Sequence, residues 1–445
     1  MRRAYFSCLL AFIFVIVAIP DSAIAEVKFK WGPYLRLRYE YWKNYKDMDN
    51  NQLDNRSFFR IKTSLWGQLD FDKNTNLFAK LTNEFKPYTY YAPSSSKSSG
   101  KTDKYFHFDI QEVVFDNLYL EINNFLGVPL DLRLGRQDFF GYGENFLLYE
   151  GTPGDGSRTF YFNALKATWH LNGHNDIDFI YTSNPRDDLF LPVINEDKAP
   201  QSLNTTHEEA FILYWKNKAI KDLAFEGYYI YKREDEDGGT GYQAQKGKIN
   251  TFGSFAKYDF SPWALRGQFA YQFGDYGNNE RRGLGGYMYL DRSFKEKLWS
   301  PQLSAGFIYL SGDDRDTAKN GSWDPLFSRS AWISEVYSLS MISETGISSY
   351  WTNLAAWRAQ LTLNPTKKTK LSFWYNFLRA NEQVAASAVF SGAGKGRGHL
   401  AVARADYAFN KNVTVYLLGE YLFPGNFYKD RDGAVFLRTE LTFKF

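Results

Sequence analysis

Charged residues occupy every second position along several segments of this sequence. Near the N-terminus, Arg36, Arg38 and Glu40 alternate with Leu35 and Leu37. Because the side chains of a β-strand point alternately to two faces, such a segment has one charged face and one apolar face. Arginine binds carboxylates through paired hydrogen bonds, and rings of basic residues on a pore wall favour anions. The pattern therefore predicts attraction of anions along a wall rather than the making or breaking of a bond.

Basic side chains outnumber acidic ones on the predicted charged face. Its basic members include Arg36, Arg38, Arg60, Lys62, Lys80, Arg266, Arg358 and Arg438. Its acidic members include Glu40, Asp70 and Glu84. Other polar residues in the same phase are Gln68, Thr82, Lys166, His170, Glu226, Lys232, Gln268, Gln360, Glu420, Glu440 and Lys444. We expect the four basic residues of the first two segments, Arg36 to Lys62, to form one basic patch opposed mainly by Glu40 and Asp70.

A second interpretation of the same residues is structural. Arginines and glutamates on neighbouring strands can pair across the wall and hold its shape without binding a solute. For any single residue the sequence favours neither interpretation. Over the first two segments, the excess of basic residues favours an anion path.

Residue patterns for catalysis or metal binding are weak. The histidines are dispersed and lack metal-ligand spacing: His107, His170, His174, His207 and His399. The only cysteine, Cys8, lies in the apolar N-terminal stretch, so thiol chemistry and disulfides are not expected beyond it. We therefore predict no enzymatic activity, no metal and no cofactor. A net charge of +3 gives no indication of a nucleic-acid partner.

The alternating segments are too long for an ordinary soluble sheet. They run for about ten to fourteen residues, whereas a tilted strand needs about 9–11 residues to cross a bilayer. The expected strands are 32–45, 58–72, 77–86, 108–122, 130–140, 160–171, 176–184, 208–216, 222–233, 249–260, 263–274, 281–291, 301–312, 350–363, 369–379, 398–409, 413–423 and 434–445. Segment 335–342 also resembles a strand, but we place it in the long loop 313–349 because an even strand number is the rule.

Composition and connections agree with an all-β, transmembrane antiparallel β-barrel of the outer-membrane type with about eighteen strands. Aromatic residues make up 19% of the chain, as expected for girdles at two membrane interfaces. Long polar loops alternate with short turns, such as 72–76 and 410–412. The chain ends on Phe445, in phase with the apolar face of the last strand, and we interpret it as a signal to the barrel-assembly machinery.

The N-terminus predicts secretion. Arg2 and Arg3 precede an apolar stretch, and Ala23-Ile24-Ala25 provides a small-residue cleavage pattern. The expected division is a signal peptide at 1–25 and a barrel at 26–445, in the bacterial outer membrane.

Three short motifs lie at the ends of expected strands: Leu134-Gly135-Arg136-Gln137, Leu310-Ser311-Gly312-Asp313 and Tyr421-Leu422-Phe423-Pro424-Gly425. Together they resemble the alginate-export family of outer-membrane proteins. The resemblance covers the whole predicted mature chain and implies a monomeric eighteen-stranded barrel with an arginine-lined lumen that conducts alginate by diffusion. It also implies that Arg136 belongs to the basic substrate path. The alginate exporter carries a plug loop between its sixteenth and seventeenth strands, whereas this chain has only the turn 410–412.

The sequence thus predicts an outer-membrane channel for passive diffusion of an anionic or polyhydroxylated solute, with export of an acidic polysaccharide such as alginate as the family's version. One alternative is a general or sugar-uptake porin whose basic wall is structural. Another is a surface receptor or adhesin whose tyrosine-rich loop 87–107 binds a partner. The expected partners are outer-membrane lipid, lipopolysaccharide, the barrel-assembly machinery and the solute.

Overall fold

The computed structural model describes residues 27–445 except 53, 86, 92–111, 149–161, 196–205, 236–244 and 329. The predicted signal peptide at 1–25, His107 and most of loop 87–107 lie outside the described residues. In the described part, no helix has the length and apolar character needed to cross a membrane.

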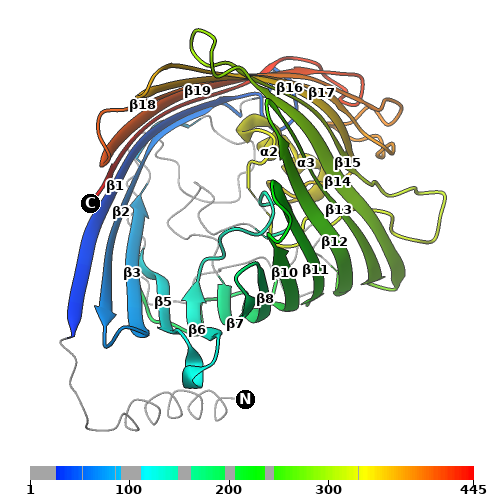
Figure 1. Cartoon of the computed structure of the whole chain (residues 1–445). Coiled ribbons are helices and arrows are strands. Elements are labelled where there is room, and N and C mark those ends of the chain that lie inside the picture. Colours follow the sequence, from blue (N-terminus) through cyan, green and yellow to red (C-terminus); the bar gives the residue numbers. More distant parts are fainter. Residues whose placement is uncertain are drawn as a thin grey trace.

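Eighteen of the twenty strands in the described residues form one closed antiparallel barrel (Figure 1). They are β1 (Lys28–Lys43), β2 (Arg56–Asp70), β3 (Thr75–Phe85), β5 (Glu112–Ile122), β6 (Leu130–Gln137), β7 (Phe162–Asn172), β8 (Asn175–Asn184), β10 (Glu208–Asn217), β11 (Leu223–Glu234), β12 (Gly247–Phe260), β13 (Trp263–Tyr276), β14 (Asn279–Ser293), β15 (Gln302–Leu310), β16 (Leu354–Thr366), β17 (Thr369–Arg379), β18 (Gly396–Ala408), β19 (Val413–Pro424) and β20 (Ala434–Lys444). Each pairs with its neighbour, and β1 closes the ring on β20 from Tyr34↔Lys444 to Lys43↔Val435. The predicted strand number and antiparallel barrel are confirmed.

Two short strands extend the wall outside the ring. β4 (Tyr88–Tyr91) pairs with the start of β2, and β9 (Val193–Asn195) pairs with the start of β5. A 3-10 turn, η1 (Phe125–Gly127), connects β5 to β6.

The two ends of the barrel differ. At the end where β1 begins and β20 finishes, strands are joined by short turns such as 71–74, 261–262 and 409–412. We call this the termini end. The opposite end, the loop end, carries connections such as 138–161 and 311–353. The turn between β18 and β19 is short, as the sequence predicted.

The faces of the wall are reversed relative to a soluble protein. Phe211, Phe269, Met288 and Leu417 are exposed on the outside, while polar and charged residues of the same strands are buried inside. Exposed apolar area costs roughly 25 cal/mol per Å² in water. A wall with this outer face is suited to lipid, as the alternation predicted.

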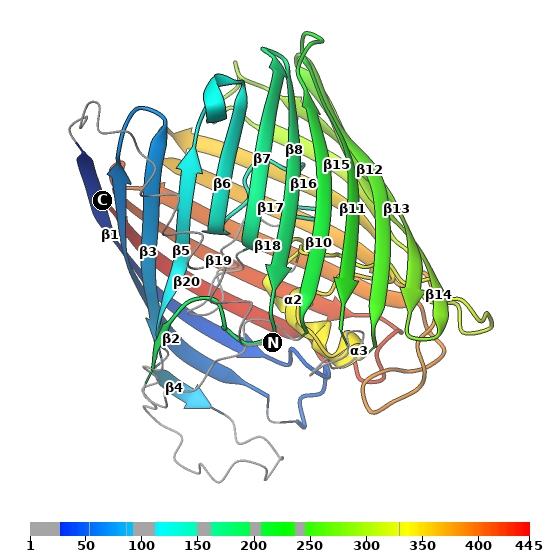
Figure 2. The ribbon, with the colours of Figure 1, turned by 90° about the horizontal axis from the view of Figure 1, so that it is seen from below.

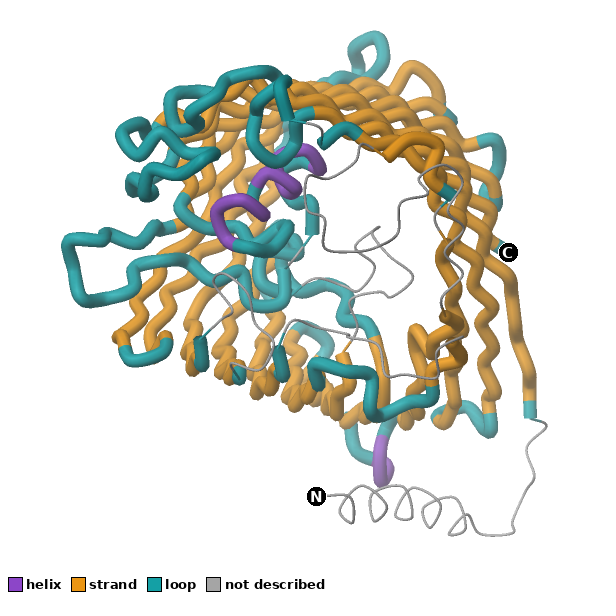
Figure 3. Tube along the Cα trace, turned by 180° about the vertical axis from the view of Figure 1, so that it is seen from behind, coloured by secondary structure: helices purple, strands orange, loops and turns teal. Residues whose placement is uncertain are grey.

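The interior is partly filled by chain that folds in from the loop end. We call residues 311–353 the inner loop; it carries α2 (Glu335–Ser340) and α3 (Ile342–Thr345), which lie inside the barrel in Figures 2 and 3. The segment 335–342, expected in a loop, is indeed outside the barrel wall, and most of it is helical. Ser334 caps α2 by accepting a hydrogen bond from the backbone N–H of Tyr337.

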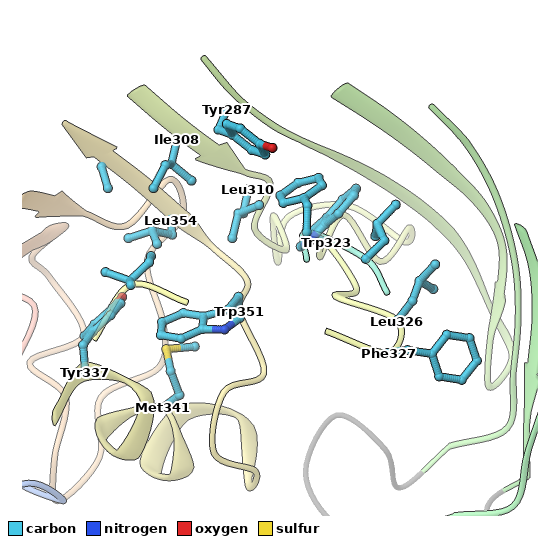
Figure 4. Packing of buried hydrophobic residues seen from close by; sticks show 14 of the residues in the cluster. Tyr287, Ile308, Leu310, Trp323, Leu326, Phe327, Tyr337, Met341, Trp351 and Leu354 are labelled. Atoms are coloured by element: carbon cyan, nitrogen blue, oxygen red, sulfur yellow. The ribbon is translucent and has the colours of Figure 1, made fainter. Parts of the chain in front are cut away.

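A hydrophobic core joins the inner loop to the wall. Trp323 stacks on Phe146 with ring centroids 5.1 Å apart, which ties the inner loop to the segment that follows β6. Figure 4 shows side chains of the inner loop facing those of the wall strands. The buried members labelled there are Tyr287, Ile308, Leu310, Trp323, Leu326, Phe327, Tyr337, Met341, Trp351 and Leu354.

Candidate functional site: the charged inner wall

Arginines and glutamates meet on the inner face where the barrel closes. We call this set the arginine–glutamate belt: Arg36, Arg38, Arg60, Arg438, Glu40, Glu84 and Glu440, from β1, β2, β3 and β20. All of them except Glu440 are at most 5% exposed. Strand register explains the arrangement. Between β1 and β2 like charges face each other, as in Arg38↔Arg60, whereas between β1 and β20 opposite charges do, as in Glu40↔Arg438.

Ion pairs across three strand boundaries connect the four arginines of the belt to its three glutamates, and Glu335 of the inner loop provides a fourth carboxylate. The pairs within the belt are Arg36–Glu84, Arg60–Glu84 (2.7 Å), Arg38–Glu440 (2.5 Å), Arg38–Glu40 (3.2 Å) and Arg438–Glu40 (2.7 Å). A buried arginine is tolerated when its charge is paired and hydrogen-bonded, and each guanidinium here has at least one carboxylate partner. The belt therefore matches the structural interpretation of these residues, while a role in selectivity stays a prediction.

The expectation that Asp70 opposes the basic patch is wrong. Asp70 lies at the termini end of β2, where its carboxylate pairs with Lys30 at 2.7 Å. It is ten residues from Arg60, about 33 Å at a strand's rise of ~3.3 Å per residue. Glu84 and Glu440 provide the opposing charge instead.

Lys62 is a buried cation on this wall whose ammonium group has no hydrogen-bond partner in the described residues. It is 2% exposed and lies directly opposite Arg36 in the register of β1 and β2. Its neighbour Lys80 differs, because that ammonium pairs with Asp116 at 2.6 Å. Since buried polar groups are nearly always satisfied, the orphaned Lys62 donor marks a place for an anion or ordered water.

Arg358, on β16, has no carboxylate within ion-pair distance among the described residues. Its Nε donates to Asn376 Oδ1 at 2.7 Å, and its Nη2 donates to the carbonyl of Ile333 in the inner loop at 3.0 Å. The side chain is half-buried. Arg358 thus carries an uncompensated positive charge beside the inner loop.

A polar cavity lies next to Arg358 at the termini end. It measures about 660 Å³, and its lining includes Arg266, Gln360, Thr362 and Lys370. Gln360 follows Arg358 by two residues on the same face of β16. Arg266 donates from Nε to Asp291 at 2.8 Å and also pairs with Glu144, so its charge is compensated. The cavity is hydrophilic and wide enough for a small solute.

The inner loop is fixed to the wall by charge. Glu420 accepts hydrogen bonds from the backbone N–H groups of Glu335 and Val336 at 3.0 and 2.7 Å, at the start of α2. The predicted lumen residue Arg438 reaches Glu335 at 2.5 Å, and Arg397 holds Glu344 of α3 at 2.7 Å. Arg438 and Glu420 thus position the inner loop.

The Gly-Arg-Gln motif is also structural in this geometry. Both Nη atoms of Arg136 donate to Asp188, at 3.0 and 2.6 Å, and Nε donates to Asn163. A Cβ at Gly135 would lie 2.2 Å from the carbonyl oxygen of Leu118, and φ at Gly135 is +127°, so glycine is required. Gln137 donates to the carbonyl of Ala164 at 3.0 Å. A role for Arg136 in a solute path stays a prediction.

The other motif residues stabilise the places where strands pass into loops. Asp313 accepts from the backbone N–H of Gly321 at 2.9 Å, and a Cβ at Gly312 would meet Asn353. Pro424 ends β19, and Gly425 donates from its backbone N–H to the carbonyl of Arg397.

The chain's last residue, Phe445, is exposed at the termini end next to β1, where its backbone N–H donates to Pro33. The described residues contain no group of three or more His, Cys, Asp or Glu placed to hold a metal ion. The predictions of an assembly signal and of no catalytic activity remain untested.

Asp138 directly follows β6, lies near Lys62 and Lys80 of the charged wall, and precedes the core residue Phe139. Burial, and next the neighbouring Asp116 carboxylate, raises the pKa of Asp138 to about 7, while Lys80 and Lys62 oppose that effect. Sequence reasoning missed this residue, because nothing local to it in the sequence signals burial beside a second carboxylate.

Comparisons with known proteins found a family to which the sequence matches and solved structures with a similar fold. The family model described as alginate export matches residues 28–440. Among solved structures, Pseudomonas aeruginosa OccK5 (OpdH) is 12% identical, with 93% of this chain and 98% of that chain covered and a TM-score of 0.55. OpdK with vanillate, from the same organism, is 10% identical, with coverages of 94% and 98% and a TM-score of 0.56.

OccK2 (OpdF) in complex with glucuronate, also from Pseudomonas aeruginosa, is 8% identical, with coverages of 94% and 98% and a TM-score of 0.55. At such identities the similarity establishes the porin fold alone. Among curated proteins, no sequence matched this chain.

Proposed function

This chain belongs to the alginate export family, and on that basis we propose that its barrel passes a small anionic or polyhydroxylated solute by diffusion. The protein is a porin-like channel of the bacterial outer membrane. Two inner-wall cations that form no ion pair with a described carboxylate, Lys62 and Arg358, carry the proposal.

The physical reason is the imbalance that these two side chains leave. Paired arginines contribute little net field, because each lies beside a carboxylate. An unpaired ammonium or guanidinium about 8 Å from an ion in water changes that ion's energy by ~0.5 kcal/mol, which is about a twofold change in local concentration. Two such groups raise the concentration of anions over that of cations in the part of the lumen near them.

Two further observations support a solute with carboxylate or hydroxyl groups. The cavity at the termini end, whose lining includes Gln360, has mainly hydroxyl, amide and charged side chains together with Pro262, Trp263 and Ala264, and this lining suits a hydrated polar molecule. Two proteins of the same fold bear vanillate and glucuronate in their structures, and both of these molecules carry a carboxylate.

Export of an acidic polysaccharide such as alginate is the finer form of the proposal, and the family supports it. The short turn 409–412 offers no plug at the termini end. A general or sugar-uptake porin is the second candidate, and the charge balance of the arginine–glutamate belt favours it. The receptor or adhesin alternative rests on loop 87–107, which is largely outside the described residues.

Ion selectivity tests the proposal. The wild type and the variants Lys62→Gln, Arg358→Gln and their combination are compared by reversal potential across a planar bilayer under a salt gradient. We expect an anion-selective wild type, and a fall in the anion-to-cation permeability ratio of about fourfold for each substitution, because each cation raises the local anion concentration and lowers the local cation concentration by about twofold. Block by glucuronate should weaken in parallel.

Lys297→Gln is the matched control, because Lys297 is an exposed cation in the turn 294–301 outside the lumen. It should leave selectivity unchanged. A wild type with no anion preference would overturn the anionic form of the proposal in favour of the general porin. Unchanged selectivity in the double variant would show that Lys62 and Arg358 do not set it.

A further inference from the structure

The outer face of the barrel is hollowed across β15 to β20. Small side chains form the floor of this depression, which we call the outer groove: Ala305, Ala359, Ala401, Ala403 and Gly419. Cross-strand register places Ala305 beside Ala359, and Ala403 beside Gly419. The four alanines are exposed, and they alternate with inward residues such as Ser304 and Val402. The floor therefore faces lipid.

Large apolar side chains wall the outer groove. Phe373 and Tyr375 stand between its two alanine pairs on β17, and Leu303 and Leu437 flank them. The groove measures about 1020 Å³, and nearly all of its surface is apolar. A hollow of this size on a lipid-facing wall contacts an acyl chain on several sides, whereas a flat wall would contact it on one side.

A single outward charge lines the outer groove in the described residues. Arg292, at the end of β14, is exposed, and its guanidinium lies 4.7 Å from the ring centroids of both Trp263 and Phe294. It forms no ion pair with a described carboxylate. The two rings fix the guanidinium at the groove's edge by cation–π contact.

The position of Arg292 along the barrel indicates which leaflet of the outer membrane it faces. β14 ends at Ser293, and the turn 294–301 belongs to the termini end. In bacterial barrels the end with short turns faces the periplasm, and aromatic residues there lie at the depth of lipid headgroups. Lipids of that leaflet are phospholipids, whose phosphate matches an arginine's planar donors.

We propose that the outer groove and Arg292 form a binding site for a phospholipid of the periplasmic leaflet. Its phosphate is held by the Arg292 guanidinium, and its acyl chains lie over the alanine floor on both sides of Phe373 and Tyr375. Trp263 and Phe294 flank the headgroup. The site lies outside the lumen, so it is independent of the solute that the channel passes.

Native mass spectrometry of the detergent-purified, full barrel tests the site. The wild type, Arg292→Gln and Ala359→Leu are titrated with dioleoyl phosphatidylglycerol and, separately, with dioleoylglycerol, which has the same chains without phosphate. We expect Arg292→Gln to weaken phosphatidylglycerol binding about tenfold, as loss of a charge-assisted hydrogen bond does. Binding of dioleoylglycerol should not change in Arg292→Gln, whereas Ala359→Leu, which fills the floor, should weaken both.

Matched controls are available on the same molecule. Arg282 lies on the outer face of the same strand at the loop end, paired with Glu280, and Ala167 is an outward small residue on β7. Arg282→Gln and Ala167→Leu should leave phosphatidylglycerol binding as in the wild type. Slower gel migration after boiling verifies that every variant is a folded barrel.

Two results would overturn the proposal. One is equal phosphatidylglycerol binding by the wild type and Arg292→Gln. The other is an equal weakening of dioleoylglycerol and phosphatidylglycerol binding in Arg292→Gln, which would show that Arg292 does not hold the phosphate.

Discussion

Two halves of the barrel interior hold the chain together by different means. On one side, the inner loop packs aromatic side chains such as Trp323 and Trp351 against the wall and forms a hydrophobic core inside a membrane barrel. On the other side, where β1 meets β20, the arginine–glutamate belt fixes the wall by ion pairs, and aromatic packing of Trp42 with Phe58 and Phe436 is confined to the loop end of these strands.

The difference teaches how a wide barrel divides its lumen. Eighteen strands enclose a space too wide for wall side chains alone to fill. The inner loop closes part of that space with apolar burial, which is non-directional and strong. The belt keeps the remaining wall polar, so that water and a solute remain compatible with it. The inner loop therefore occupies part of the lumen, and charged side chains line the wall where β1 meets β20.

The largest effect should come from breaking the packed half. Trp323→Ala removes a side chain that is 1% exposed and stacked on Phe146, and loss of such a residue costs about 3–5 kcal/mol. We expect a lower unfolding temperature in detergent and a higher single-channel conductance, because the inner loop loses its anchor.

Trp169→Ala provides the comparison for Trp323→Ala, since Trp169 is 45% exposed on the outer face of β7. It should have a much smaller effect on stability and none on conductance. Equal behaviour of the two variants would mean that the inner loop is held mainly by its ion pairs to Arg397 and Arg438.

A smaller effect should follow from unbalancing the charged half. Glu84→Gln removes the carboxylate shared by Arg36 and Arg60 and leaves two buried guanidinium groups undercompensated. Because Gln keeps one acceptor oxygen for the two guanidinium groups, we expect a loss of roughly 1–3 kcal/mol in unfolding free energy, together with a stronger anion preference in reversal-potential measurements. Glu280→Gln, which removes an exposed carboxylate at the loop end, should change neither. A shift in the ion selectivity of Glu84→Gln toward cations would contradict the conclusion that Glu84 compensates the charge of Arg36 and Arg60.

The strand pattern was predictable from sequence because lipid enforces it on every strand. An apolar residue at each second position cannot be exchanged for a charge without a large cost, so the alternation marks most strand ends to within a few residues. The same argument explains why α2 was not predicted. Val336 and Leu339 are buried within the barrel on a helix of six residues. Because this helix does not face lipid, its apolar residues need not recur at a regular spacing in the sequence.

Pairing within the site was harder to predict, because it depends on register between strands that are distant in the chain. Arg38 and Glu440 are separated by 402 positions, and nothing local to either residue identifies the other. The misplacement of Asp70 was avoidable, since the strand rise alone separates it from Arg60. The inner loop's aromatic packing follows no sequence period at all, so Trp323 and Trp351 gave no signal.

The smallest effect concerns Asp138, which lies where the two halves meet. Its pKa is raised to about 7 by burial and by Asp116, so the folded state favours the protonated carboxyl. The stabilising contribution of protonation is complete below the ordinary carboxyl pKa, and it is lost as pH rises through 7. Between pH 6 and pH 8 the unfolding free energy should therefore fall by about 1.4 kcal/mol from this group alone. Asp138→Asn, which mimics the neutral form, should remove that part of the pH dependence when both proteins are unfolded by urea in detergent at the two pH values.

If the wild type and Asp138→Asn lose the same stability over this range, Asp138 is ionised in the fold, and the boundary between the packed and charged halves is wetter than the burial of this carboxyl indicates.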